Sequence, residues 1–84
     1  MLYRVVVKRS AEKELDALPA SVRERIVVRL LTLEDNPRPS GVKKLQGEES
    51  YRLRVGDYRV WFTIDDRQQV VAIYAVGHRR EVYR

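Results

Sequence analysis

A glycine–aspartate pair inside an alternating stretch constrains this chain most. Gly56-Asp57 separates two runs, 51–55 and 58–65, in which apolar and polar side chains largely alternate. A two-residue loop with glycine first is typical of a type II′ β-hairpin, and that loop fixes how the flanking strands pair. The predicted register places Val55 opposite Tyr58. A shift by one residue would expose the whole apolar set, so we expect this register to be held firmly.

The same register sorts the side chains of the hairpin onto two faces. The face expected to cover the core contains Tyr51, Leu53, Val55, Tyr58, Val60, Phe62 and Ile64. The other face carries Arg52, Arg54, Arg59 and Trp61. Arg54 is predicted to lie directly opposite Arg59, and like charges at cross-strand positions destabilise by up to about 1 kcal/mol. The pair becomes favourable when a phosphate binds between the guanidinium groups. The alternative is a solvated sheet face on which arginine stems cover Trp61.

Charge and composition narrow the class of protein. The chain has 84 residues, with 44% hydrophobic and 35% charged side chains, which fits a single globular domain spanning 1–84. Its net charge is +5, and thirteen of the seventeen basic residues are arginine, the side chain suited to bidentate phosphate contacts. Charge therefore favours a polyanionic partner, although an arginine-rich coding bias would give the same composition.

Several function classes are excluded or disfavoured by what the chain lacks. It contains no cysteine and a single histidine, so we expect no disulfide, no thiolate nucleophile, no zinc site and no cofactor. The first ten residues contain three charges and no long apolar stretch. They match neither a signal peptide nor a membrane span, and we expect a cytoplasmic protein.

Periodicity predicts an α+β fold. A first strand is expected over Leu2–Val7, followed by a short helix capped by Ser10 and ended by Pro19. A second helix should begin at a capping box formed by Ser21 and Glu24 and continue to Asn36-Pro37. Its additional apolar residues Val27, Val28 and Leu31 suggest burial on more than one side.

After the second helix the period changes from 3.6 to 2. Strands are expected over Lys43–Gln46, Tyr51–Val55, Tyr58–Asp65 and Gln69–Gly77. Short connections predict an antiparallel meander of three to four strands, with both helices on one face of the sheet.

A second basic cluster follows the last predicted strand. It is the segment His78-Arg79-Arg80-Glu81-Val82-Tyr83-Arg84. Together with the hairpin arginines it indicates a surface that handles phosphate groups, although a solvated chain end would have a similar composition.

The motifs together resemble a known family. Lys44-Leu45-Gln46-Gly47, Tyr51-Arg52-Leu53-Arg54, Gly56-Asp57-Tyr58-Arg59-Val60 and Val76-Gly77-His78-Arg79-Arg80-Glu81-Val82-Tyr83 are similar to segments of RelE-type toxins of the RelE/ParE toxin–antitoxin superfamily. The resemblance covers nearly the whole chain. It implies a bacterial or archaeal type II toxin that cuts mRNA in the ribosomal A site without a metal, and an antitoxin of the RelB type that wraps around it.

The resemblance also implies site residues. Family active-site positions fall on Arg52, Arg54, Arg59, Arg79 and Tyr83. Contacts to RNA are expected from Lys43, Lys44, Trp61, His78 and Arg80. Nothing in the sequence demands an oligomer. Two alternatives remain open: a ParE-type inhibitor of DNA gyrase, and a member of the fold that binds ribosomes or RNA without cutting.

One departure from the family concerns the general base. Related toxins often carry lysine where this chain has Arg52 and Arg54, and arginine stays protonated at any working pH. Either charge stabilisation suffices, with the ribosome aligning the mRNA, or another group takes the proton. His78 is the candidate, although its neighbour Arg79 should point to the opposite side of an extended segment.

Overall fold

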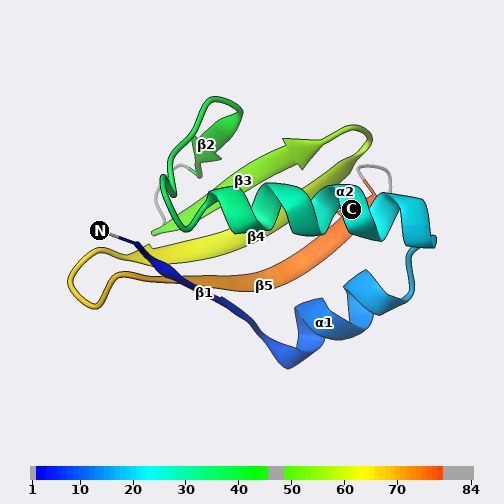
Figure 1. Cartoon of the computed structure of the whole chain (residues 1–84), viewed down its shortest axis with the longest axis horizontal. Helices are drawn as coiled ribbons and strands as arrows, with labels where there is room; N and C mark the ends of the chain where they lie inside the picture. Colours follow the sequence, from blue (N-terminus) through cyan, green and yellow to red (C-terminus); the bar gives the residue numbers. More distant parts are fainter. Residues whose placement is uncertain (1, 46–48, 79–84) are drawn as a thin grey trace.

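The computed structural model describes residues 2–45 and 49–78, which form an α+β fold with a five-stranded mixed sheet (Figure 1). The elements are β1 (Arg4–Val7), α1 (Arg9–Asp16), α2 (Ala20–Thr32), β2 (Val42–Lys44), β3 (Ser50–Val55), β4 (Tyr58–Asp65) and β5 (Val70–His78). The strand order is β1-β5-β4-β3-β2, so β2 and β1 form the two edges of the sheet. The fold class predicted from the sequence is confirmed.

The β3–β4 hairpin has the predicted register. Val55 pairs with Tyr58, Arg54 with Arg59 and Leu53 with Val60. Gly56 has a φ of 60°, a conformation that glycine adopts without steric cost and that the first position of a type II′ turn requires. Local turn chemistry and the alternation of side chains therefore agree on one pairing of these strands.

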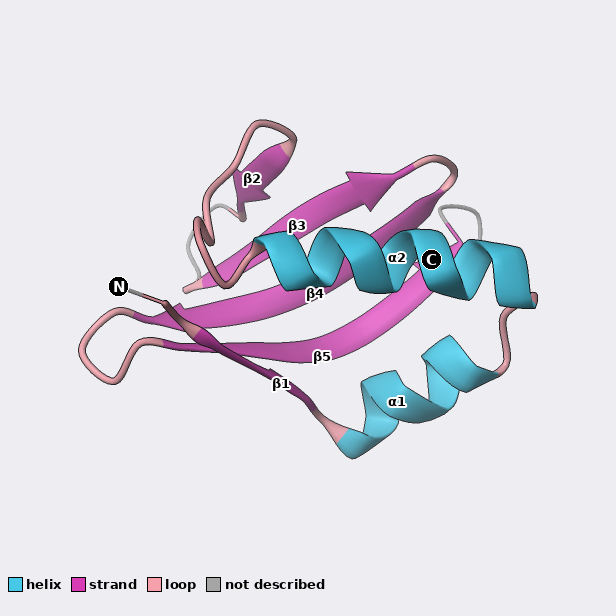
Figure 2. Ribbon diagram, in the orientation of Figure 1, coloured by secondary structure: helices cyan, strands magenta, loops and turns pink. Residues whose placement is uncertain are grey.

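Both helices lie on the same face of the sheet (Figure 2). The buried core joins Ala11 and Leu15 of α1 and Ile26 and Leu30 of α2 to the apolar face of β3, β4 and β5. The largest fully buried side chain is Phe62, in the middle of β4. This packing leaves the opposite face of the sheet uncovered by helices.

Helix α2 is buried on one side only, which corrects the sequence-based expectation. Val28 and Leu31 are 61% and 56% exposed, and Val27 is 38% exposed, whereas Ile26 is fully buried. The helix lies over the sheet as a single layer, and none of the other helices and strands that the structure describes covers its outer side (Figure 1). Its apolar stripe is therefore wider than the surface it packs against.

The helix starts also differ from the expected caps. Helix α1 begins at Arg9 after Lys8, and helix α2 at Ala20 after Pro19, and neither start has a side-chain cap. Ser10 lies inside α1, where its hydroxyl donates to the carbonyl of Tyr74 at 3.1 Å. Ser21 lies within the first turn of α2. Pro19 takes the start of α2 because its fixed φ fits a helix entry and it needs no amide partner.

Two features of β5 could not be read from periodicity. It pairs in parallel with β1 on one side and antiparallel with β4 on the other. A bulge lies where Trp61 pairs with Ala75 but Phe62 pairs with Ile73, so Tyr74 is the extra residue. The bulge changes which side chains of β5 face the helices.

No helix in the described ranges is long and apolar enough to cross a membrane.

Candidate nucleic-acid interface

Three arginines share the face of the sheet that the helices leave uncovered. Arg52 and Arg54 on β3 alternate with the buried core residues of that strand, and Arg59 lies on β4 directly opposite Arg54. Their exposure differs: Arg54 is exposed, Arg52 is half-buried and Arg59 is only 5% exposed. An exposed row was expected, so the burial of Arg59 is a finding. Burial restricts the rotamers of this side chain and holds its guanidinium in place.

Cross-strand pairing adds further residues to this face. Lys43 of β2 pairs with Arg52, which in turn pairs with Trp61, and Trp61 pairs with Ala75. These four residues form one row across the sheet. Trp61 is half-buried and lies between a basic side chain and a small one. An aromatic ring next to cationic groups is the combination that single-stranded RNA-binding surfaces use.

The second row is Arg54, Arg59 and Gly77. Because Gly77 has no side chain, β5 offers nothing on this face that would push the Arg59 stem outward. The hairpin therefore places Arg54 and Arg59 at opposed positions on the same face, and the β5 residue in this row is a glycine. An anion binding here would meet preorganised donors.

Two of the residues predicted to bind RNA lie on the other face. Lys44 pairs with Tyr51, a core residue, so it belongs to the helix-covered side and is separated from Lys43. His78 pairs with Tyr58, and the two rings meet edge to face with centroids 5.1 Å apart. Tyr58 faces the helices, as does its partner Val55. The structure thus brings neither Lys44 nor His78 to the arginine face.

The remaining predicted residues, Arg79, Arg80 and Tyr83, lie outside the described ranges. Their roles stay predictions. Among described residues, no group of three or more His, Cys, Asp or Glu could hold a metal ion.

The arginine face also contains a hydroxyl pair that sequence reasoning missed. The Ser50 and Tyr74 hydroxyls are hydrogen-bonded, and Ser50 is buried although it lies on the side of Arg52. Tyr74 is the bulge residue, and its side chain reaches Ser50 across β4. Only knowledge of the bulge would have predicted this contact, because Tyr74 looks like a core residue in an unbroken strand.

A network around Arg38 is the second feature that the sequence did not reveal. Its guanidinium binds both carboxylate oxygens of Asp66, at 3.1 and 2.9 Å, and lies 5.2 Å from the centre of the Tyr51 ring. The Tyr3 hydroxyl donates to Asp66 at 2.6 Å. These bonds, first from Arg38 and then from Tyr3, lower the pKa of Asp66 to about 2. The pKa of Tyr3 is raised, chiefly because its proton is shared with that carboxylate.

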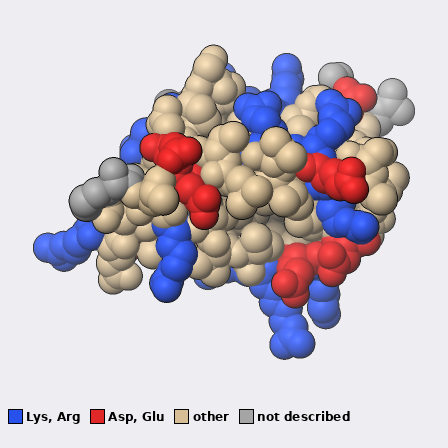
Figure 3. All heavy atoms as spheres, viewed as in Figure 1, with Lys and Arg blue, Asp and Glu red and all other residues tan. Residues whose placement is uncertain are grey.

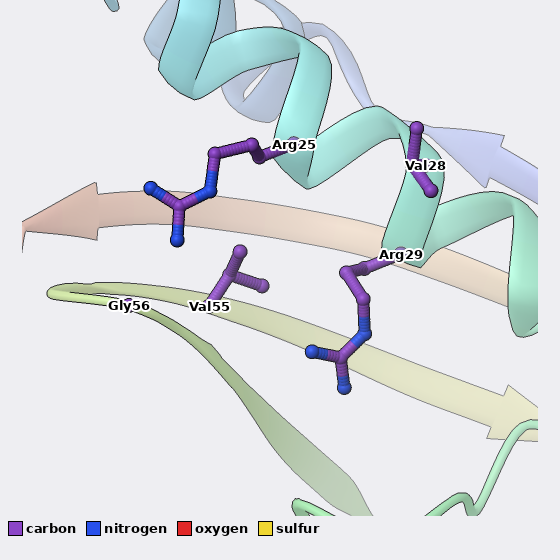
Figure 4. A pocket seen from close by; sticks show the side chains of 5 residues that line it. All are labelled: Arg25, Val28, Arg29, Val55 and Gly56. Atoms are coloured by element: carbon purple, nitrogen blue, oxygen red, sulfur yellow. The ribbon is translucent and has the colours of Figure 1, made fainter.

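A shallow pocket of about 290 Å³ lies on the helix side, between α2 and the tip of the β3–β4 hairpin. Arg25, Val28, Arg29, Val55 and Gly56 line it, and both arginine side chains extend from α2 toward the hairpin (Figure 4). The same side of the molecule carries basic and acidic groups intermixed (Figure 3). This pocket is therefore separate from the arginine face.

Comparison with known proteins decides the family. Residues 5–83 match the family described as "ParE toxin of type II toxin-antitoxin system, parDE". The chain is 31% identical over 90 residues to the putative toxin RelE1 of Methanocaldococcus jannaschii, covering 100% of this chain and 98% of that protein. This chain is a RelE-type toxin of the RelE/ParE superfamily.

Solved structures of RelE-type toxins have the same fold. A chain of the RelE–RelB complex from Pyrococcus horikoshii is 33% identical and superimposes with a TM-score of 0.84, covering 94% of this chain and 97% of that chain. A chain of the RelBE2 complex from Mycobacterium tuberculosis is 29% identical, also with a TM-score of 0.84, covering 94% of this chain and 100% of that chain. The chain is thus the toxin of a type II toxin–antitoxin system.

Proposed function

We propose that this RelE-type toxin is an mRNA interferase, an endoribonuclease that cleaves mRNA in the ribosomal A site and so inhibits translation. The observation that carries the proposal is the Arg54–Arg59 pair, with Arg52 on the same face. Two arginines at directly opposed positions, with a third on the same sheet face away from the helices, supply the charge-assisted donors that a phosphate-binding site needs. The ribosome as target implies a cytoplasmic site of action.

The proposed reaction is a transesterification at one phosphodiester. The 2′-oxygen of the ribose loses its proton and forms a bond to phosphorus, and the bond from phosphorus to the 5′-oxygen of the next nucleotide breaks. The leaving oxygen takes up a proton, which gives a 2′,3′-cyclic phosphate and a 5′-hydroxyl. The pentacovalent intermediate carries an extra negative charge. Arg52, Arg54 and Arg59 are the donors that would stabilise it.

The other roles rest on the family resemblance. Arg79 approaches the leaving oxygen, and Tyr83 stacks on a base or orients the 2′-hydroxyl. Lys43 and Trp61, on the arginine face, contact the RNA strand, and Arg80 contributes a further phosphate contact.

The proton of the 2′-hydroxyl needs a separate acceptor. Arginine does not accept it, because its guanidinium stays charged. His78 is directed to the helix-covered side, next to Tyr58. In this proposal the ribosome aligns the mRNA so that charge stabilisation by the arginines dominates, and proton removal is left to solvent or to a ribosomal group.

The regulatory partner in this proposal is a cognate antitoxin of the RelB type. The solved relatives from Pyrococcus horikoshii and Escherichia coli are RelE–RelB complexes. Co-purification of the chain with the antitoxin encoded beside it, at a defined ratio, tests this part of the proposal.

Primer extension on a defined mRNA tests the proposed reaction. Purified toxin is incubated with the mRNA alone and with the mRNA on programmed bacterial ribosomes. A cut within the A-site codon that needs ribosomes supports the proposal, and Arg59→Ala should abolish it. Intact mRNA in the presence of folded toxin bound to ribosomes would refute the nuclease function.

A second candidate function follows from the description of the matching family, which is that of ParE. ParE-type toxins resemble RelE in fold but poison DNA gyrase. A supercoiling assay with purified gyrase separates the two functions. Inhibition of supercoiling together with intact mRNA would favour the gyrase target.

A further inference from the structure

Strand β2 is the weakest part of the RNA-facing sheet. It contains three residues, lies at the sheet edge and pairs only with β3. Lys43 of β2 lies opposite Arg52, and like charges at such positions repel each other. The strand is held by three residue pairs, one of them between like charges, and by the Val42 side chain, which packs against the core. A further restraint would offset the repulsion between Lys43 and Arg52.

The Arg38–Asp66 pair lies where it can provide that restraint. Arg38 belongs to the segment that connects α2 to β2, and Asp66 belongs to the turn between β4 and β5. The two side chains form a bidentate ion pair, with the shorter contact at 2.9 Å. The Arg38 side chain also donates to the Tyr51 hydroxyl at 3.2 Å. The segment before β2 is thereby fastened to both β3 and the far end of β4.

Further contacts transmit this attachment to β2. The amide of Val42 donates to the carbonyl of Pro39 at 3.1 Å, which connects the start of the strand to the anchored segment. Beyond the strand, the amide of Leu45 donates to the carbonyl of Ser50 at 2.8 Å. Tyr3 supports the carboxylate from a third segment, because its hydroxyl donates to Asp66. The ion pair thus joins parts of the chain that are far apart in sequence.

We propose that the Arg38–Asp66 ion pair is a positioning device for RNA binding: it holds β2 against the repulsion between Lys43 and Arg52, and so keeps Lys43 on the RNA-facing side. This inference rests on the proposed function. Neither Arg38 nor Asp66 touches RNA. Both lie at the helix-side edge with Tyr51, and they act on RNA only through the position of Lys43.

The test compares two substitutions that change the net charge equally. Asp66→Asn removes the ion pair, whereas Asp35→Asn removes an exposed carboxylate of the same α2–β2 region that makes no ion pair within the described residues. Binding of a short single-stranded RNA is measured at several salt concentrations. Charge alone would make both variants bind more tightly. We expect Asp35→Asn to bind at least as tightly as wild type, and Asp66→Asn to bind about fivefold more weakly with a shallower salt dependence.

A double-mutant cycle identifies the residue through which the ion pair acts. In a Lys43→Ala background, Asp66→Asn should cause no further loss of affinity, because the contact it positions is already gone. The charge swap Arg38→Asp with Asp66→Arg should restore binding toward that of wild type. The proposal would be overturned if Asp66→Asn lowered the RNA affinity equally with and without Lys43→Ala. It would also be overturned if Asp66→Asn bound RNA more tightly than wild type.

Hydrogen exchange on the same samples separates this inference from the proposed function. The Leu45 amide should exchange faster in Asp66→Asn than in Asp35→Asn, while amides in the centre of β4 keep their protection. Unchanged Leu45 protection would refute the restraint on β2. Wild-type toxin that binds no RNA would refute the RNA function itself, and the exchange of Leu45 would still decide whether the ion pair holds the strand.

Discussion

Arg54 and Arg59 face each other across the β3–β4 hairpin, one on each strand and two pairs from the turn. The hairpin register that places seven apolar side chains toward the core also forces these two cations together. Neither can move to the other side of the sheet without breaking that register. The cost of this contact and its proposed use are therefore two aspects of one arrangement.

Removing one of these charges should stabilise the fold and damage the activity. Arg54→Gln removes one of two like charges at directly opposed positions, and we expect the free energy of unfolding to rise by about 0.5 kcal/mol. Ribosome-dependent cleavage should fall on the order of 100-fold, because one donor to the phosphorane is lost. Urea denaturation and single-turnover cleavage check the two effects. The matched control is Arg67→Gln, an exposed arginine of the β4–β5 turn, which should change neither quantity appreciably.

A methyl group at the hairpin turn should destabilise the fold. Gly56→Ala places a Cβ at a φ of 60° and 3.1 Å from a guanidinium nitrogen of Arg25. We expect the free energy of unfolding to fall by about 1–2 kcal/mol, measured by chemical denaturation. In an Arg25→Ala background, the part of this loss that comes from the clash with Arg25 should disappear, and the part that comes from the positive φ should remain. A loss that vanishes completely in that background would show that the positive φ costs nothing here.

Acid should weaken the fold through Asp66. The folded-state pKa of this carboxyl is lowered from 3.8 to about 2, so its contribution to stability is fully present above pH 4 and is lost as the pH falls toward 2. Denaturation midpoints measured between pH 5 and 2 should decline more steeply for wild type than for Asp66→Asn. Asp35→Asn should retain the steep wild-type decline. If the denaturation midpoints of wild type and Asp66→Asn declined equally with falling pH, the ion pair would not contribute to the stability of the fold.

Two neighbouring positions of α2 should respond differently to the same truncation. Ile26 is fully buried, so Ile26→Ala leaves a cavity and should cost about 2–4 kcal/mol. Val28 is 61% exposed, and Val28→Ala should change the free energy of unfolding by less than about 0.5 kcal/mol. Thermal denaturation of wild type and both variants measures the two losses in stability. Similar losses would mean that the outer side of α2 is covered.

The hairpin was predictable because its information is local. Gly56-Asp57 and the alternation around it determine which residues pair, and the structure confirms the predicted pairing and the grouping of Arg52, Arg54 and Arg59. The separation of Lys43 from Lys44 follows from the same alternation. Two consecutive residues of a strand cannot share a face.

The rest depended on contacts between residues far apart in sequence. The position of His78 depends on the register between β4 and β5, which the bulge at Tyr74 shifts. The partners Arg38 and Asp66 are 28 residues apart, and no pattern in the sequence pairs them. The expected caps at Ser10 and Ser21 were wrong because Ser10 binds the carbonyl of Tyr74 and α2 begins at Ala20, directly after Pro19.

The parallel pairing of β1 with β5 has a consequence for synthesis. Strand β1 is made before the other described strands, yet its partner in the described sheet is β5, the last of them in sequence order. The edge formed by β1 cannot assemble until Val70–His78 has been translated and released from the exit tunnel. Until then β1 has no partner among the described strands, and the sheet stays without one of its two edges.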